Sequence, residues 1–259
     1  MNVSSTTSLT NNSLNLNTNI AKLSSGLKIN KAADDASGMA IANKMSTQVH
    51  GLGQAIENSN NAIGMIQVAD GAMQEYKSIL DDIRGLTLKA SNGIMNSSNK
   101  ASIQKEIDGL LSSANNIINT TSYNGQDLLK GDNDFSFHTG ANSGEYTELD
   151  FGNASSTLPS VDVSSSTSIE ESLKNIDDAL KSAGEIMTNL GSGQNALESN
   201  VRNISVSQIN IASAESQIRD LDFAKESADF NKNKILEQAG IFALTQKNIA
   251  QANVLNLLK

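Results

Sequence analysis

The sequence predicts a mainly α-helical fold, in which long antiparallel helices form an elongated, coiled-coil-like bundle with paired N- and C-terminal helices and a small β-hairpin region. Three observations support this prediction. The 259 residues include 1 proline, Pro159, so long helices can run without interruption. Aromatic residues make up only 3% of the chain, which favours thin aliphatic seams over a large aromatic core. Apolar residues also recur three and four positions apart, as in helices that pack side by side.

The first part of the chain carries a weak helical signal followed by a strong one. Residues 1–22 are mostly Asn, Ser, Thr and Leu, which predicts a segment that is weakly helical or disordered when alone. A heptad-like seam from about Ala32 to Ala90 predicts a helix well beyond the roughly 8–20 residues of a typical globular helix. The pair Asn92-Gly93 predicts its end.

The middle of the chain combines a shorter helix with a hairpin and a loop. Apolar residues on one side of 98–119 predict a second helix, and Tyr123-Asn124-Gly125 predicts a turn. Alternating residues predict strands at Phe135–His138 and Tyr146–Phe151. Residues 152–168 are rich in Ser and Thr and contain the proline, so they predict a loop.

Helical signals resume in the last third of the chain. Ser168 and Glu171 fit a capping box that opens a helix over about 168–190. The glycines at 191–193 are expected to interrupt it, and a further helix is expected over about 194–220. The final helix is predicted from about 230 to 258, and its unusually apolar end implies that something buries it.

Composition argues against several functional classes. The formal charge of −9 argues against nucleic-acid binding, because phosphate contacts need a surplus of Lys and Arg. With 0 Cys and 2 His, we expect no disulfide, metal or cofactor site. No apolar run reaches about 18 residues, so we expect no membrane insertion. The first 23 residues lack the basic start and apolar stretch of a secretory signal.

Two short patterns have both a chemical and a structural interpretation. Gly191-x-Gly193-x-x-Ala196 matches a relaxed dinucleotide fingerprint, but no strand precedes it, so we favour a loop between helices. Asp34 and Asp35 could form an acid–base pair. They also suit the first turns of a helix, where acids complement the helix dipole. We favour the structural interpretation in both cases and predict that the chain is not an enzyme.

Motifs at the two ends of the chain together resemble the bacterial flagellins, and the resemblance covers nearly all of residues 13–150 and 170–259. The N-terminal motifs are Leu23–Asn30 and Ala33–Ala42. The C-terminal motifs are Ile218–Ala224, Ile235–Gly240 and Asn253–Leu258. Between them, the turn and the hairpin of the family are matched by Tyr123–Gly125 and Thr139–Asn142. Large outer domains are absent, so the sequence resembles a short form of the family.

The resemblance implies a structural subunit of the flagellar filament used for swimming. Such a subunit assembles with copies of itself into a helical polymer outside the cell, after type III export without a cleaved signal peptide. Residues 1–30 and 222–259 are then expected to be the terminal helices of the inner core of the filament. Residues 31–221 are expected to form the outer-tube domain, including the hairpin and loop at about 123–168. The candidate polymerisation core consists of apolar C-terminal residues: Ile235, Ala239, Phe242, Ile249, Val254, Leu255, Leu257 and Leu258.

The resemblance also implies partners besides other copies of the chain. These are the cap and junction proteins, and an export chaperone expected to bind Phe242–Leu258. A Toll-like receptor that senses flagellins reads a segment that corresponds to Leu80–Leu86 here. Arg84 and Leu86 match the family pattern, whereas Asp82 and Gly85 stand where Arg and Glu are usual. Weakened receptor recognition is therefore expected.

Some flagellins carry O-linked sugars on exposed Ser or Thr. The candidate acceptors are in the predicted loop: Ser155, Ser156, Ser164, Ser165, Ser166 and Thr167. Two alternatives to a filament subunit stay open from the sequence. One is the hook–filament junction protein. The other is a flagellin-like secreted effector that stays monomeric, and an N-terminal segment shorter than the family pattern keeps this second alternative open.

Overall fold

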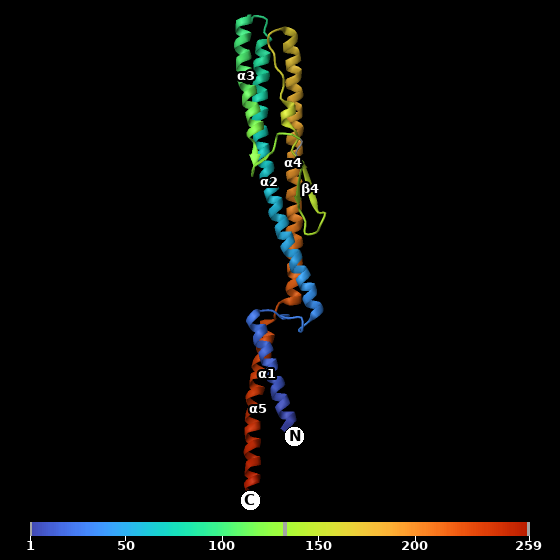
Figure 1. Cartoon of the computed structure of the whole chain (residues 1–259), viewed down its shortest axis with the longest axis vertical. Helices are drawn as coiled ribbons and strands as arrows, with labels where there is room; N and C mark the ends of the chain where they lie inside the picture. The colour runs from blue at the N-terminus through green and yellow to red at the C-terminus, as the bar shows by residue number, and fades with distance from the viewer. Residues whose placement is uncertain (1, 132–133, 258–259) are drawn as a thin grey trace. The chain divides into compact units, whose positions relative to one another are not determined.

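The computed structural model describes residues 2–131 and 134–257, and this part of the chain is mainly α-helical (Figure 1). Its long helices are α1 (Asn2–Ser25), α2 (Ala36–Ala90), α3 (Ser97–Thr120), α4 (Ser166–Arg219) and α5 (Phe223–Leu257). The remaining elements are β1 (Ser122–Tyr123), β2 (Gln126–Asp127), β3 (Asp134–His138), β4 (Tyr146–Asp150) and the 3-10 helix η1 (Ala154–Thr157). The predicted helical fold with a small hairpin region is confirmed.

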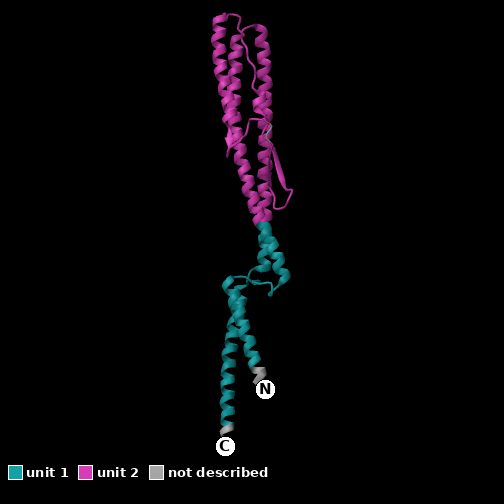
Figure 2. Cartoon of the chain, in the orientation of Figure 1, with its two compact units in different colours: residues 1–49, 209–259 teal, residues 50–208 magenta. Residues whose placement is uncertain are grey.

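The chain folds into two compact units (Figure 2). The terminal unit comprises residues 1–49 and 209–259, and it contains α1, α5 and the adjoining ends of α2 and α4. The central unit comprises residues 50–208, with α3, the hairpins and most of the two long helices. The assignment of residues 1–30 and 222–259 to an inner tube concerns a polymer and stays a prediction.

The core of the central unit is built from one apolar stripe on each of α2, α3 and α4. On α3, the buried positions Ile103, Ile107, Ala114 and Ile118 are spaced by four and seven, so they share one face. They pack with residues such as Tyr76 of α2 in one continuous apolar cluster. The aliphatic seams predicted from the composition therefore form this core.

The hairpin of β3 and β4 is antiparallel and contributes its own apolar side chains to the core. Phe135 lies opposite Leu149 in the register, and Leu149 is buried. Phe135 also meets the fully buried Phe151 edge to face, with ring centroids 5.2 Å apart. The strands predicted at 135–138 and 146–151 are thus confirmed to within a residue at each boundary.

The predicted interruption at Gly191–Gly193 is wrong, because α4 is continuous from Ser166 to Arg219. Gly193 is buried, and a Cβ at this position would lie 2.7 Å from Leu149 Cδ2. The glycine therefore lets the hairpin approach the helix instead of ending the helix. The loop between helices that we favoured over a dinucleotide-binding site at Gly191–Ala196 is therefore also wrong. This segment lies in the interior of α4.

A second hairpin, with a two-residue turn, joins β1 to β2. Tyr123 pairs with Gln126, and the two residues between them, Asn124 and Gly125, have φ angles of 50° and 77°. Two successive positive φ angles are characteristic of the type I′ turn, which Asn-Gly strongly prefers. The turn predicted at Tyr123–Gly125 is confirmed.

The segment at 152–165 follows the predicted loop only in part, because it is held on the core. The Gln104 side chain donates to Val161 O at 3.0 Å and accepts from Val163 N at 2.9 Å. Both valines are buried. From α4, Ser172 Oγ accepts from Asp162 N at 2.8 Å and donates to Asp162 O at 3.0 Å. Side chains of two helices thus satisfy backbone groups that a neighbouring strand would otherwise satisfy.

Two helix starts differ from the predictions because a different residue caps each helix. At α4, Ser165 Oγ accepts from Ser168 N at 3.1 Å, so the predicted capping box that starts at Ser168 is wrong by three positions. At α5, Asp222 Oδ1 accepts from Lys225 N at 3.0 Å, so the helix starts at Phe223 instead of near Phe230. In each case the earlier cap lengthens the helix.

The terminal unit pairs α1 with α5, which run antiparallel (Figure 1). At one end of the pair, a short backbone bridge joins the segments that enter and leave it. Lys28 N donates to Arg219 O at 2.7 Å, and Leu221 N donates to Gly26 O at 3.0 Å. Gly26 has a φ of 71°, which a side chain rarely tolerates, and this allows the turn directly after α1. The predicted pairing of the terminal helices is confirmed.

Candidate functional site: the terminal helix pair

The α5 helix carries large apolar side chains that the chain itself leaves in water. Ile235, Phe242 and Ile249 are seven positions apart, so they share one side of the helix. They are 65%, 71% and 49% exposed, respectively, and Val254 and Ala239 are also exposed. These residues are the described members of the predicted polymerisation core. The Leu255 and Leu257 side chains and the whole of Leu258 lie outside the described residues.

The side of α5 that faces α1 is different, because it is largely polar. Its partly buried positions follow three-and-four spacing from Glu226 to Lys247. Asn12 Nδ2 of α1 donates to Asn233 O at 2.7 Å. Oriented to suit its neighbours, the Asn19 amide donates to Glu226 Oε1 at 3.1 Å and accepts from Asn233 Nδ2 at 3.2 Å.

A groove of about 450 Å³ runs between the two helices. Its lining combines small, apolar and polar residues: Ser8, Leu9, Asn12, Leu236, Gly240, Ala243, Leu244 and Lys247. Gly240 lies against the Leu9 side chain, which occupies the space where a Cβ would stand. The two helices therefore approach each other closely at Gly240. α1 covers one side of α5, and the side with Ile235, Phe242 and Ile249 stays exposed.

The asparagines of this seam were missed by the sequence analysis. Asn19 is only 8% exposed, and Asn12 and Asn233 are partly buried. A buried asparagine at a heptad position costs stability but restricts how two helices can pair. The signal that could have found them is the regular order Leu9, Asn12, Leu16, Asn19, Leu23, in which Leu and Asn alternate along one face.

The carboxylates Asp34 and Asp35 have structural partners, but they precede α2, which begins at Ala36, so the predicted place in the first turns of a helix is wrong. Asp35 Oδ1 accepts from Gly38 N at 2.9 Å and caps α2. The hydrogen bond from Gly38 N, with that from the Ser37 hydroxyl, lowers the pKa of Asp35 below its ordinary value. Hydrogen bonds from the Asn30 and Lys31 backbone likewise lower the pKa of Asp34. Both carboxylates therefore accept hydrogen bonds within the turn between α1 and α2.

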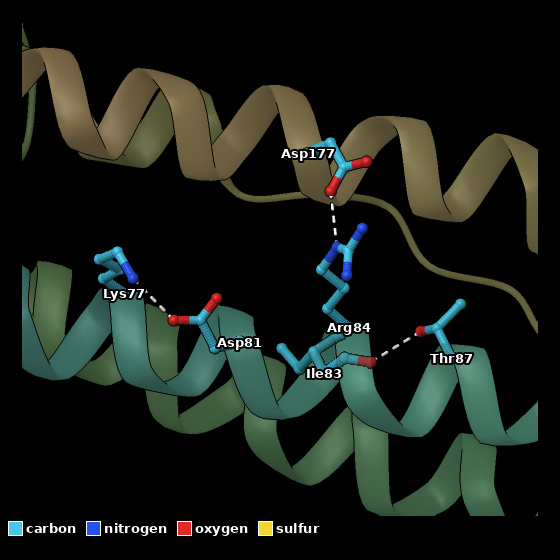
Figure 3. Close-up of polar contacts among 6 residues, drawn as sticks. All are labelled: Lys77, Asp81, Ile83, Arg84, Thr87 and Asp177. Carbon is cyan, nitrogen blue, oxygen red and sulfur yellow. Dashed lines mark hydrogen bonds and ion pairs between the residues drawn. The ribbon is translucent and has the colours of Figure 1, made fainter.

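The candidate receptor-facing segment lies on α2 in the central unit, where Arg84 has a partner inside the chain. Arg84 Nε lies 2.7 Å from Asp177 Oδ1 of α4, and Figure 3 shows the side chain reaching between the helices. This hydrogen bond raises the pKa of Arg84 further above its ordinary value. Asp82 and Gly85 are exposed, whereas Leu86 is partly buried against the core.

The candidate glycosylation residues are all exposed, although they do not all lie in a loop. Ser155 and Ser156 belong to η1, whereas Ser166 and Thr167 lie in the first turn of α4. Ser164 Oγ donates to Asp162 Oδ2 at 2.9 Å, and Ser165 serves as the cap of α4. Whether any of these residues is modified stays a prediction.

Within residues 2–131 and 134–257, no helix is long and apolar enough to cross a membrane. The same part of the chain contains no group of three or more His, Cys, Asp or Glu residues that could hold a metal ion. A mainly helical fold with paired terminal helices and an exposed apolar face on α5 is typical of structural proteins.

Comparison with known proteins identifies the family. Residues 1–134 match the bacterial flagellin N-terminal helical region, and residues 173–258 match the bacterial flagellin C-terminal helical region. The flagellar filament 33 kDa core protein of Treponema phagedenis is 37% identical, over 97% of this chain and 95% of that protein. The flagellin of Halalkalibacterium halodurans is 38% identical, over 92% of this chain and 90% of that one.

A solved structure agrees at the level of the fold. The crystal structure of Bacillus cereus flagellin is 23% identical and superposes with a TM-score of 0.53, covering 61% of this chain and 94% of that one. The chain therefore belongs to the bacterial flagellin family, which is a family of structural proteins.

Proposed function

We propose that this chain is a flagellin subunit that polymerises through its terminal helices into the extracellular flagellar filament. The single observation that carries the proposal is the exposed apolar face of α5, formed by Ile235, Phe242 and Ile249. Relatives that this chain matches over nearly their whole length are named as flagellar filament core proteins and flagellins. Residues 1–30 and 222–259 then form the inner core, and residues 31–221 form the outer tube.

The energetics favour a polymer over a single contact. Burying one large, fully exposed apolar side chain stabilises by about 1.5–3 kcal/mol, and Ile235, Phe242 and Ile249 are between half and three-quarters exposed. One such face therefore supplies only a few kcal/mol. Association costs about 4–15 kcal/mol in lost freedom of motion, so several copies must contact each subunit at once. Contacts that do not close on themselves extend into an open helical polymer.

The experiment that tests this proposal is salt-induced polymerisation of the purified full chain, observed by electron microscopy with and without preformed seeds. The test variant is Phe242→Ser with Ile249→Ser. The matched control is Ile94→Ser, which also removes an exposed apolar side chain, here 83% exposed, but from the loop after α2. We expect filaments from the parent and the control only. Filaments from the Phe242/Ile249 variant would place the driving force elsewhere.

The two alternative functions predict other outcomes of the same experiment. A monomeric secreted effector would give no filament from the full chain, even with seeds. A hook–filament junction protein would bind to filament or hook ends without extending them. Either result would overturn the proposal of a filament subunit. We also propose that the chain has no enzymatic activity, in keeping with a family of structural proteins.

Before assembly, we propose that an export chaperone covers the apolar part of α5 from Phe242 onwards, and that export needs no cleaved signal peptide. Cap and junction proteins are the further proposed partners. The exposed Phe242 side chain supports the chaperone proposal, because an apolar surface in the unassembled subunit needs a cover. Deletion of residues 242–258 is expected to abolish chaperone binding in a pull-down, and unchanged binding would contradict the proposal.

We propose that recognition by the flagellin-sensing Toll-like receptor is weakened. Two features support this: Arg84 is held by Asp177, and Asp82 and Gly85 depart from the family pattern. The double variant Asp82→Arg/Gly85→Glu should activate receptor reporter cells at a lower concentration than the parent. Activation by the parent at the concentration sufficient for an enteric-type flagellin would refute the weakening.

We propose that any O-glycosylation falls on the exposed hydroxyls between η1 and the start of α4. Exposure of Ser155, Ser156 and residues 164–167 supports this assignment. The expected observation is an intact mass above that of the bare chain, with the excess assigned to the peptide that covers 155–167. An intact mass equal to that of the bare chain would dispose of the proposal.

A further inference from the structure

The chain contains two Asn-Gly pairs, and the structure places them in two different turns. Asn92-Gly93 lies in the loop between α2 and α3, whereas Asn124-Gly125 forms the turn between β1 and β2. Both asparagines are exposed. Asn-Gly is the pair in which the next backbone nitrogen can most easily attack the asparagine side chain, because glycine has no side chain to obstruct it.

Asn92 lies in a turn in which its N–H donates to Lys89 O at 3.3 Å and its carbonyl accepts from Met95 N at 3.0 Å, but the nitrogen that would make this attack is unpartnered within the described part of the chain. The Gly93 N–H has no hydrogen-bond partner among the described residues, and the space around its Cα is open. The Asn92 side chain is turned toward the residues that follow it, since its Oδ1 lies 3.4 Å from Ile94 N.

We propose that Asn92 is a site of spontaneous deamidation, with water as the only co-reactant. The Gly93 nitrogen attacks Cγ of Asn92, a new C–N bond forms, and the bond from Cγ to Nδ2 breaks. The amide proton of Gly93 leaves with Nδ2 as ammonia, and a five-membered succinimide remains. Water then opens the ring at either carbonyl, which yields aspartate or isoaspartate. No redox step is involved.

Asn124 is protected by its turn, although its sequence is equally favourable. Its φ of 50° and the 77° of Gly125 define a two-residue turn held between the pairs Tyr123–Gln126 and Ser122–Asp127. Ring closure requires the backbone after the asparagine to rotate out of its present conformation. That rotation would break the strand pairing on both sides, so the barrier is higher at Asn124 than at Asn92.

The product adds one negative charge to each chain, in an exposed loop that also carries Ile94. The charge lies after the C-terminus of α2, where the helix dipole disfavours it, and before the N-terminus of α3, where the dipole favours it. The isoaspartate product also lengthens the backbone of this loop by one methylene. The inference does not depend on the proposed filament function.

The test compares the two sites within one sample of the full folded chain, kept at mildly alkaline pH and sampled over time. Cleavage after Lys gives one peptide, residues 90–100, for Asn92 and another, residues 106–130, for Asn124. Fragmentation in the mass spectrometer then locates the replacement of amide by acid at Asn92 and at Asn124, because each peptide contains further asparagines. We expect Asn92 to convert faster by about tenfold or more, the factor that 1.4 kcal/mol of barrier produces.

Two controls separate the effect of structure from the effect of sequence. In urea both pairs are freed, so their rates should become similar. The variant Asn92→Gln should remove the conversion at position 92, and Gly93→Ala should slow it. Equal rates for Asn92 and Asn124 in the folded chain would overturn the inference, as would an intact Asn92 after Asn124 has converted.

Discussion

Replacing Gly193 by Ala tests which effect is larger at this position of α4: the packing of the hairpin against the helix or the helix propensity of the residue. Two effects oppose each other. In the middle of a helix, Ala is favoured over Gly by about 1 kcal/mol. The added Cβ would lie 2.7 Å from Leu149 Cδ2 and 3.8 Å from Ile66 Cδ1, and both side chains are buried. Forcing a methyl group into a packed core costs about 1–3 kcal/mol, so we expect a net loss near 1 kcal/mol.

Gly191 provides the matched control, because it lies two positions earlier in the same helix, is exposed, and has open space within 4 Å of the place where an added Cβ would stand. Gly191→Ala should therefore stabilise the chain by about 1 kcal/mol. In thermal melts followed by circular dichroism, this corresponds to a rise of roughly 2–4 °C. Gly193→Ala should instead lower the melting temperature. The difference between the variants isolates the contact with Leu149, because both share the gain in helix propensity.

Equal stabilisation by the two variants would refute the reasoning, because it would mean that the hairpin moves away without cost. A double-mutant cycle with Leu149→Val sharpens the test. Removing part of the Leu149 side chain should relieve the clash, so the double variant should be more stable than the sum of the single effects by about 0.5–3 kcal/mol. Strict additivity would place the cost elsewhere.

Three further predictions follow from the described contacts. Hydrogen bonding lowers the pKa of Asp35, so its stabilisation of the α2 start is present above the ordinary pKa and is lost as pH falls through the folded-state pKa. Hydrogen exchange of the Gly38 N–H should accelerate over that pH range. Asp35→Asn should make this exchange less dependent on pH. Gln104→Ala should lower the free energy of unfolding in urea by about 1–3 kcal/mol, because it leaves the Val161 carbonyl without its hydrogen-bond donor. Asn19→Ala should speed amide exchange in α1 and leave α3 unchanged.

The sequence predicted the β3–β4 hairpin, the turn at Tyr123–Gly125 and the presence of the long helices, because each has a local signal. Asn124-Gly125 specifies its turn whatever surrounds it, and the stripe on α3 needs no knowledge of its partners. Gly193 was misinterpreted because its signal is not local. Glycine usually weakens a helix, and only the approach of Leu149 from a distant strand explains why it is tolerated here. The predicted start of α4 was wrong for another reason: a capping-box pattern begins at Ser168, whereas the cap that the structure uses is Ser165, three residues earlier.

The apolar residues of α5 could be predicted to form an interaction surface, because an apolar segment at the end of a chain is expected to be buried against something. The asparagine seam could not, since Asn and Ser are common throughout the chain, at 67 of 259 residues, and one more Asn carries little information. What distinguishes Asn19 is burial next to Asn233, which is a tertiary property. Polar seams are thus harder to find in such a composition than apolar ones.

The contact between Asn12 and Asn233 joins residues 221 positions apart, and this separation has a consequence for the order of folding. Closing so long a loop in an unfolded chain is entropically unfavourable and slow. Within the central unit, Gly53 and Gln208 lie next to each other. Once that unit has folded, the free chain between the asparagines shrinks to about 66 residues, which lowers the closure cost by about 1 kcal/mol. Folding should therefore begin in the central unit, and the terminal helices α1 and α5 should pair last.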